Sequence, residues 1–170
     1  DVIINVQGDE PLIHPESLAL VAAPFYDDEN VSMASLMHPL LHYQSYMNPN
    51  VVKVVVDDQH NAIYFSRNPI PFFRDARPLL DRWEKDGARP PELRPVPMKH
   101  LGVYAYRSNF LQALVRMPRT ELEDAEMLEQ LRVLAWGFKI RMVSTPHDSV
   151  GVDVPEDARV VEAIIREQGE

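Results

Sequence analysis

The stretch Val2-Ile3-Ile4-Asn5-Val6-Gln7-Gly8-Asp9-Glu10-Pro11 does most to indicate the fold. A short, β-branched apolar run stops abruptly at a glycine, two carboxylates and a proline. Such continuous apolarity is typical of a parallel strand that is buried on both faces of a sheet. Ligands in open α/β sheets bind just beyond the carboxyl ends of such strands, so Asp9 is a candidate functional carboxylate. The alternative is a plain turn, because Gly-Asp-Glu-Pro is also favourable turn sequence.

The composition is that of an ordinary folded domain. The chain has 170 residues, of which 45% are hydrophobic and 25% charged, and this is enough for a hydrophobic core. The net charge of −9 argues against nucleic acid as a partner, but a nucleotide substrate stays open because metal ions can neutralise phosphates. The absence of cysteine excludes disulfides and thiol catalysis and is compatible with a cytoplasmic location. No apolar run approaches the roughly 20 residues of a membrane helix, so no membrane partner is expected.

Hydrophobic periodicity predicts a mixture of helices and strands in a single domain over residues 1–170. Pro24 should end or kink the first helix, and Thr120 with Glu123 forms a capping box for a helix that runs on to Gly137. After the opening strand, strands are expected at residues 31–37, 51–56, 62–66, 99–107 and 138–142. Four helices are expected: one that begins at Pro15, one capped by Ser108, one that begins at Thr120 and one that begins at Asp153.

The excursion over residues 69–97 and the start of the chain are unusual. Seven of the fifteen prolines fall within 69–97, which predicts a long surface loop with one short helix around Trp83. Loops of this length are usually lids, interface arms or disordered. The chain begins one residue before its first strand, and a strand buried on both faces needs neighbours on both sides, so we expect earlier βα units to be missing.

Two aspartates are candidate metal ligands. Asp9 ends a strand and Asp153 begins a helix, and if the two converge, their hard oxygen donors suit Mg²⁺ held partly by water and substrate phosphates. Sequence alone cannot bring them together. The alternative for Asp153 is a plain helix cap.

Three further groups are candidate ligand contacts. Arg67 follows a hairpin arm and could bind a carboxylate or phosphate, or could simply be solvated. His100 and Tyr104 share one strand face and could donate hydrogen bonds to a polyhydroxy ligand, or could be core residues. Glu129 and Gln130 lie in the middle of a predicted helix, where a solvated face with local ion pairs is the alternative.

Five segments, taken in order, resemble one family, the 3-deoxy-manno-octulosonate (Kdo) cytidylyltransferases. The resemblance covers nearly the whole chain, and five ordered motifs make it far more specific than any single one. The segments are Asn5–Pro11, Tyr64–Arg67 with Ile70-Pro71, His100–Arg107, Glu126–Arg132 and Gly151–Asp157.

The resemblance implies a Rossmann-like α/β nucleotidyltransferase fold, with a mixed, mostly parallel sheet and a dimerisation hairpin and arm at about residues 51–99. It implies a Mg²⁺-dependent cytoplasmic homodimer that transfers CMP from CTP to the anomeric hydroxyl of Kdo, giving CMP-Kdo and pyrophosphate for lipopolysaccharide biosynthesis. Asp9 and Asp153 would hold the metal and serve catalysis. The implied sugar-acid pocket consists of Gln7, Arg67, His100, Tyr104, Glu129 and Gln130.

The sequence departs from the family in several places. The family's amino-terminal third, which carries the loop that grips the CTP phosphates, is absent from this sequence. Val154 stands where threonine is usual, Asp124-Ala125 stands where His-Ile is common, and residues 75–97 align poorly. The alternatives are a cytidylyltransferase for another sugar acid, such as amino-Kdo or a sialic acid, and a catalytically incomplete fragment that dimerises.

Overall fold

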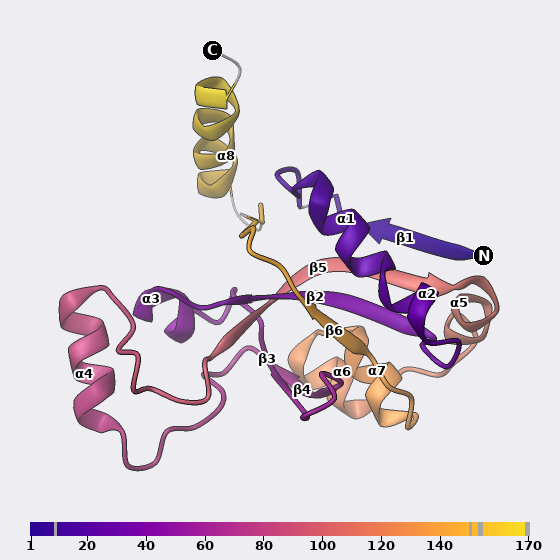
Figure 1. Cartoon of the computed structure of the whole chain (residues 1–170), viewed down its shortest axis with the longest axis horizontal. Coiled ribbons are helices and arrows are strands. Elements are labelled where there is room, and N and C mark those ends of the chain that lie inside the picture. The colour runs from indigo at the N-terminus through magenta and orange to yellow at the C-terminus, as the bar shows by residue number, and fades with distance from the viewer. Residues whose placement is uncertain (9, 150, 153–154, 169–170) are drawn as a thin grey trace.

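The computed structural model describes residues 1–8, 10–149, 151–152 and 155–168 (Figure 1). The strands are β1 (Val2–Val6), β2 (Met33–Pro39), β3 (Lys53–Val56), β4 (Ala62–Ser66), β5 (Met98–Arg107) and β6 (Arg141–Ser144). The helices are α1 (Pro15–Ala22), α2 (Pro24–Asp27), α3 (Tyr43–Met47), α4 (Arg77–Asp86), α5 (Ser108–Leu114), α6 (Glu121–Glu126), α7 (Gln130–Ala135) and α8 (Pro155–Gln168). Among the described residues, no helix combines the length and apolarity needed to cross a lipid bilayer.

The six strands form one mixed sheet with the order β4-β3-β5-β2-β6, and β1 pairs with β5 outside this path. The long strand β5 runs antiparallel to β1, β2 and β3, whereas β2 and β6 run parallel. The expected α/β architecture is confirmed, but the expectation of a mostly parallel sheet is wrong, because the sheet is mostly antiparallel. The short turn at 57–61 allows β3 and β4 to pair only in the antiparallel direction.

Strand β1 is present where the sequence predicts it, but its setting differs. It pairs antiparallel with β5, and the exposed fractions of Ile3, Ile4 and Val6 are 41%, 40% and 39%. The expectation of a parallel strand buried on both faces is therefore wrong for the described structure. An apolar run indicates a strand but does not encode the direction in which it pairs.

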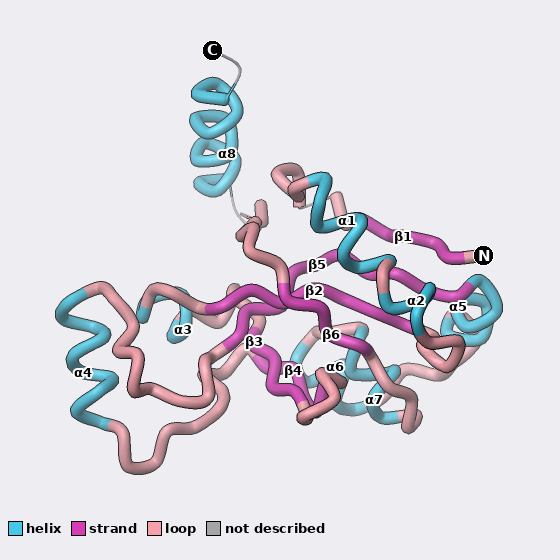
Figure 2. Tube along the Cα trace, in the orientation of Figure 1, coloured by secondary structure: helices cyan, strands magenta, loops and turns pink. Residues whose placement is uncertain are grey.

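Strand β5 divides the core into two layers. Tyr104 and Tyr106 pack on the side of α5 and α7, whereas Leu101, Val103 and Ala105 pack against α1 and α2. Figure 2 shows α1 above β5 and β2, and α7 below them. The alternation predicted for residues 99–107 is confirmed, and it directs His100, Tyr104 and Tyr106 toward the same face.

The excursion over residues 69–97 is also confirmed, together with a helix, α4, around Trp83. Together with residues 40–51 this arm forms a small separate core, in which Trp83 is fully buried and packs with Tyr46 and Leu93. The indole Nε1 of Trp83 donates to the carbonyl oxygen of Leu41 at 2.8 Å. The arm is therefore an ordered part of the fold, and its role in dimerisation stays a prediction.

Helix boundaries differ from expectation at two positions. Ser108 is the first residue of α5, and the cap position belongs to Arg107, so Ser108 does not cap the helix. The single helix expected from Thr120 to Gly137 is divided into α6 and α7. The last helix begins near the expected point, and its predicted cap, Asp153, lies outside the described residues.

Candidate functional site

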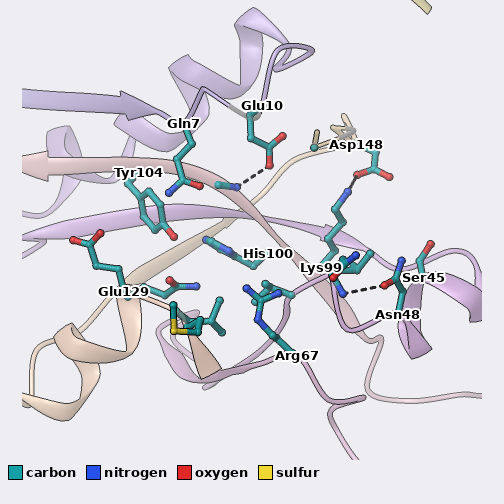
Figure 3. Close-up of a pocket in the computed structure, with 18 residues that line it drawn as sticks. Gln7, Glu10, Ser45, Asn48, Arg67, Lys99, His100, Tyr104, Glu129 and Asp148 are labelled. Atoms are coloured by element: carbon teal, nitrogen blue, oxygen red, sulfur yellow. Dashed lines mark hydrogen bonds and ion pairs between the residues drawn. The ribbon is translucent and has the colours of Figure 1, made fainter. Parts of the chain in front are cut away.

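One cavity of about 650 Å³ brings together polar residues from widely separated segments. Its walls come from the ends of β1 and β4, from β5, from residues 45–52, from the start of α7 and from the segment after β6. Figure 3 shows Gln7, Tyr104 and Arg67 gathered around His100. The lining includes all six residues expected for the sugar-acid pocket: Gln7, Arg67, His100, Tyr104, Glu129 and Gln130.

The two predicted metal ligands, Asp9 and Asp153, lie outside the described residues. Residues close to them in the sequence do border the cavity: Gln7 and Glu10 near Asp9, and Gly151 near Asp153. The segments that carry the two carboxylates therefore both reach the same cavity.

Glu126 fixes Arg67 at the end of β4. One carboxylate oxygen, Oε2, accepts from the backbone nitrogen of Arg67 at 2.9 Å, and the carbonyl oxygen of Glu126 accepts from Arg67 Nε at 2.8 Å. Arg67 Nη1 donates to the carbonyl oxygen of Pro49 at 3.1 Å. Within the described part of the chain nothing accepts from Nη2, so this nitrogen is available to a ligand in the cavity.

The second oxygen of Glu126 binds β4 itself. Oε1 accepts from Ser66 Oγ at 2.6 Å and from the Tyr64 hydroxyl at 3.3 Å. Desolvation raises the pKa of Glu126, but the hydrogen bonds from Arg67, Ser66 and Tyr64 and the charge of Arg67 outweigh it and lower this pKa overall. Glu126 is thus an ionised anchor. Sequence reasoning missed this role, because the residue looks like one more acid on a helix.

The break between α6 and α7 places Glu129 and Gln130. Met127 adopts a left-handed conformation with φ 54°, so Glu129 becomes the residue before α7 and Gln130 its first residue. Both border the cavity from the start of a helix and not, as expected, from its middle. The break follows from side-chain demands on both sides, because Glu126 is held by β4 while Leu128 is buried in the core.

A salt bridge between Glu123 on α6 and Arg132 on α7 spans this break. Thr120 Oγ1 accepts from the backbone nitrogen of Glu123 at 3.4 Å, as the predicted capping box requires. The carboxylate of Glu123, however, takes two bonds of 2.7 and 2.5 Å from Arg132 on α7. The hydrogen bond to Arg132 lowers the pKa of Glu123. The pair therefore joins the two short helices.

Glu10 joins three segments around the cavity. Its Oε1 accepts from the backbone nitrogen of Gly102 at 3.1 Å, and its Oε2 accepts from Ser149 Oγ. Lys99 holds the same segment, because its Nζ donates to Asp148 Oδ1 at 2.9 Å and to the carbonyl oxygen of Ser149 at 2.6 Å. The residue after Asp9 is thus tied to β5 and to the segment that leads toward Asp153. Sequence reasoning read Glu10 only as turn chemistry.

Gly102 leaves room for Gln7. A Cβ atom built on Gly102 would lie 2.7 Å from Gln7 Oε1 and 3.4 Å from Glu10 Oε1. Any larger residue at this position must therefore displace the Gln7 amide from its place at the cavity.

Lys53 supports the wall opposite Glu10. This side chain is fully buried, and its Nζ donates to the carbonyl oxygens of Asn48, Val51 and Arg67 at 3.0, 2.7 and 2.5 Å. Burial lowers its pKa to about 8, opposed by the charge of Glu126 and aided by that of Arg67. The three bonds fix residues 48–51 and Arg67 relative to each other.

One histidine cluster lies outside the cavity. Potential ligand atoms of His14, Glu16 and His147 lie within 4.8 Å of one another, and this is the one such group that the described residues contain. The two rings stack at 3.6 Å with planes 13° apart, so their in-plane lone pairs do not converge on one point. His14 Nδ1 already accepts from the backbone nitrogen of Glu16 at 3.2 Å. The cluster ties the start of α1 to the segment after β6.

Comparison with known proteins agrees with the geometry. Residues 1–140 match the profile of a family described as Cytidylyltransferase. The 3-deoxy-manno-octulosonate cytidylyltransferase of Geobacter metallireducens is 47% identical over 170 residues, covering 99% of this chain and 65% of that protein. The enzyme of the same description from Syntrophus aciditrophicus is 40% identical over 165 residues, covering 97% of this chain and 60% of that protein.

A solved structure has the same fold. It is described as CMP:2-keto-3-deoxy-manno-octonic acid synthetase complexed with CTP, and it superposes with a TM-score of 0.82 at 34% identity. The match covers 99% of this chain and 63% of that chain. The present chain thus spans less than two thirds of the length of these similar proteins.

Proposed function

Because the chain belongs to the cytidylyltransferase family, we propose that the protein transfers CMP from CTP to the anomeric hydroxyl of Kdo, giving CMP-Kdo and pyrophosphate. The observation that carries this proposal is the cavity of about 650 Å³ that is lined by Gln7, Arg67, His100, Tyr104, Glu129 and Gln130. Its size falls in the range of small-molecule sites. Its lining combines the fixed guanidinium of Arg67 with neutral hydrogen-bonding groups and with carboxylates, and its second cation, Lys99, is already paired with Asp148. An unpaired guanidinium nitrogen beside several hydrogen-bonding groups suits a molecule with one carboxylate and many hydroxyls.

Arg67 is the proposed partner of the Kdo carboxylate. Its Nε, Nη1 and backbone nitrogen are occupied within the protein, so the guanidinium is held before the ligand arrives. Charge-assisted bonds from a fixed arginine give strong and directional recognition of a carboxylate. In a 2-ulosonic acid the anomeric carbon is bonded to the carboxylate carbon, so anchoring the carboxylate also places the reacting hydroxyl.

The proposed chemistry needs positioning more than covalent catalysis. The anomeric oxygen forms a bond to the α-phosphorus of CTP, the bond from that phosphorus to the bridging oxygen breaks, and pyrophosphate leaves with those electrons while the hydroxyl loses its proton. Both substrates are anions, so alignment and charge neutralisation supply most of the rate. Arg67 would neutralise one of these charges.

Mg²⁺ is the metal that we propose for Asp9 and Asp153. Carboxylate oxygens are the donors that Mg²⁺ prefers. Glu10, next to Asp9, and Gly151, two residues before Asp153, border the cavity. When bound, the ion would neutralise triphosphate charge and make the attacking hydroxyl more acidic. Glu10 would support this arrangement, because it joins the segments that carry the two aspartates.

We also propose a homodimer, formed through the hairpin and arm at residues 51–99, in the cytoplasm. The arm exposes 84% of the Phe72 side chain, and covering such a large apolar group would favour association. Sedimentation of the purified protein, with Phe72→Ser as the variant, tests the dimer directly.

A panel of sugar acids tests the proposed reaction. The protein that contains this chain is incubated with CTP, Mg²⁺ and either Kdo, amino-Kdo or a sialic acid, and pyrophosphate release and the nucleotide product are measured. We expect CMP-Kdo as the preferred product. Preference for another acid would correct the substrate, and no CMP transfer to any sugar acid would contradict the proposal.

A further inference from the structure

Ser35 and His100 form a buried pair behind the cavity. Ser35, on β2, is fully buried, and its Oγ lies 2.8 Å from His100 Nε2. The same oxygen lies 2.8 Å from the carbonyl oxygen of Val103 and 3.4 Å from that of Leu101. The serine oxygen therefore has three polar neighbours but only one hydrogen to donate.

Counting hydrogens settles the direction of each bond. A carbonyl oxygen can only accept, so the hydrogen between Ser35 and Val103 must belong to the serine hydroxyl. That hydroxyl has no second hydrogen, so the bond between Ser35 and His100 is donated by the ring nitrogen Nε2. Without this arrangement two lone pairs would face each other at 2.8 Å.

The ring then has no hydrogen on its other nitrogen. Burial, with a smaller contribution from the charge of Lys99, lowers the pKa of His100 to about 3, so the ring is neutral near pH 7. A neutral imidazole carries one N–H, and here that hydrogen is on Nε2. Nδ1 has no hydrogen-bond partner among the described residues, and the ring borders the cavity.

Backbone geometry keeps the ring in place. The pairing of β2 with β5 shifts register between Ser35 and Leu36, and this irregularity brings two carbonyls of β5 to the serine hydroxyl. The backbone nitrogen of His100 donates to the carbonyl oxygen of Val52 at 2.9 Å. Its ring meets Phe65 edge-on, with centroids 5.0 Å apart.

We propose that Ser35 is a positioning residue that makes His100 a hydrogen-bond acceptor toward the cavity, so that the ligand group at Nδ1 is a hydroxyl. This role differs from the expectation that His100 donates to the ligand. A carboxylate or phosphate oxygen at Nδ1 would meet a lone pair, and this would direct the sugar carboxylate to Arg67. The identity of that hydroxyl as part of Kdo rests on the proposed function, whereas the state of the ring does not.

The ring state is tested in the protein without ligand. Long-range ¹H–¹⁵N correlation spectra of imidazole-labelled protein distinguish the two neutral forms and the charged form of His100. We expect a hydrogen on Nε2 only, unchanged between pH 5 and pH 8. A hydrogen on Nδ1, or a charged ring in this range, would overturn the proposal. Ser35→Ala should lose the single form, whereas Ser32→Ala, whose hydroxyl makes no hydrogen bond within the described residues, should keep it.

The ligand group is tested with deoxy analogues of Kdo, each lacking one hydroxyl. Calorimetric affinities are compared in the unaltered protein and in Ser35→Ala. We expect one hydroxyl whose removal weakens binding roughly fivefold to tenfold in the unaltered protein and less than about twofold in the variant. Equal losses in both proteins for every analogue would refute the role of Ser35. A hydrogen on Nε2 without any sugar-acid binding would instead reject the proposed function and leave the positioning role standing.

Discussion

At the residue scale, Arg67 offers the sharpest test of how the sugar acid is held. Lysine at this position keeps the charge but cannot reproduce the separate bonds from Nε and Nη1 while also presenting a nitrogen to the cavity. For Arg67→Lys we predict that the KM for Kdo rises by about tenfold to a hundredfold, as expected for loss of a charge-assisted bond. The KM for CTP should stay within about twofold.

Steady-state kinetics with each substrate varied in turn would measure this. Arg74→Lys is the matched control, because Arg74 is exposed on the arm and away from the cavity lining. Equal increases in both KM values would contradict the assignment of Arg67 to the sugar side.

We predict that a larger residue in place of Gly102 impairs substrate binding without impairing folding. In Gly102→Ala the three atoms nearest the new Cβ all belong to the ends of side chains, those of Gln7 and Glu10. The Gln7 amide should move, so we expect the KM for Kdo to rise severalfold while the melting temperature changes little. Gly8→Ala, where a Cβ meets nothing within 4 Å, should leave both unchanged. A large loss of melting temperature in Gly102→Ala with unchanged KM would show that the crowding is structural.

The burial of His100 should make the free energy of unfolding depend on pH. Burial lowers its pKa from 6.5 to about 3 in the folded protein, so below pH 6.5 the unfolded chain binds a proton that the folded chain refuses. The free energy of unfolding should therefore fall as the pH drops from 6.5 toward 3. Between pH 7 and pH 5 the contribution is on the order of 1–2 kcal/mol.

Urea unfolding at pH 7 and pH 5 would measure this contribution. His100→Gln should be less stable at pH 7 but should lose this part of the pH dependence. If the variant and the unaltered protein lose equal stability between the two pH values, His100 is not a buried neutral group.

At the element scale, Glu10 couples β5 to the segments after β1 and β6. Removing Ser149 Oγ leaves Glu10 Oε2 without its partner in a buried place. We predict that Ser149→Ala lowers the free energy of unfolding by about 1–3 kcal/mol. In a background that already carries Glu10→Ala, the same substitution should cost much less, because the two residues act as one unit.

A double-mutant cycle by urea unfolding measures this coupling. Ser144→Ala is a control at an exposed position near the end of β6. Additive effects of Glu10→Ala and Ser149→Ala would show that the bond does not join these segments.

Some helices and strands can be predicted from local sequence patterns and others cannot. The hairpin of β3 and β4 follows from a β-branched run and an aromatic-rich run on either side of a turn. The two faces of β5 follow from the alternation of its residues. The break between α6 and α7 has no local signal, because Met127 is an ordinary helix former. It arises from contacts of Glu126 with β4 and of Glu123 with Arg132, which are tertiary.

At the scale of the whole molecule, motif order predicted more than periodicity did. Gln7, Arg67, His100 and Glu129 were predicted as one pocket from resemblance, and they line one cavity. The sheet direction was mispredicted, because the apolar run of β1 fits either direction of pairing. Glu10, Lys53 and Glu126 were missed because each acts through backbone groups that only the folded chain brings near.

The most direct test of the sugar-acid site is a crystal structure of the protein with Kdo bound. We predict that Kdo binds in the cavity of about 650 Å³, with its carboxylate within hydrogen-bond distance of Arg67 Nη2 and one hydroxyl within that distance of His100 Nδ1. Kdo bound elsewhere, or a CTP phosphate in place of the sugar carboxylate at Arg67, would contradict it.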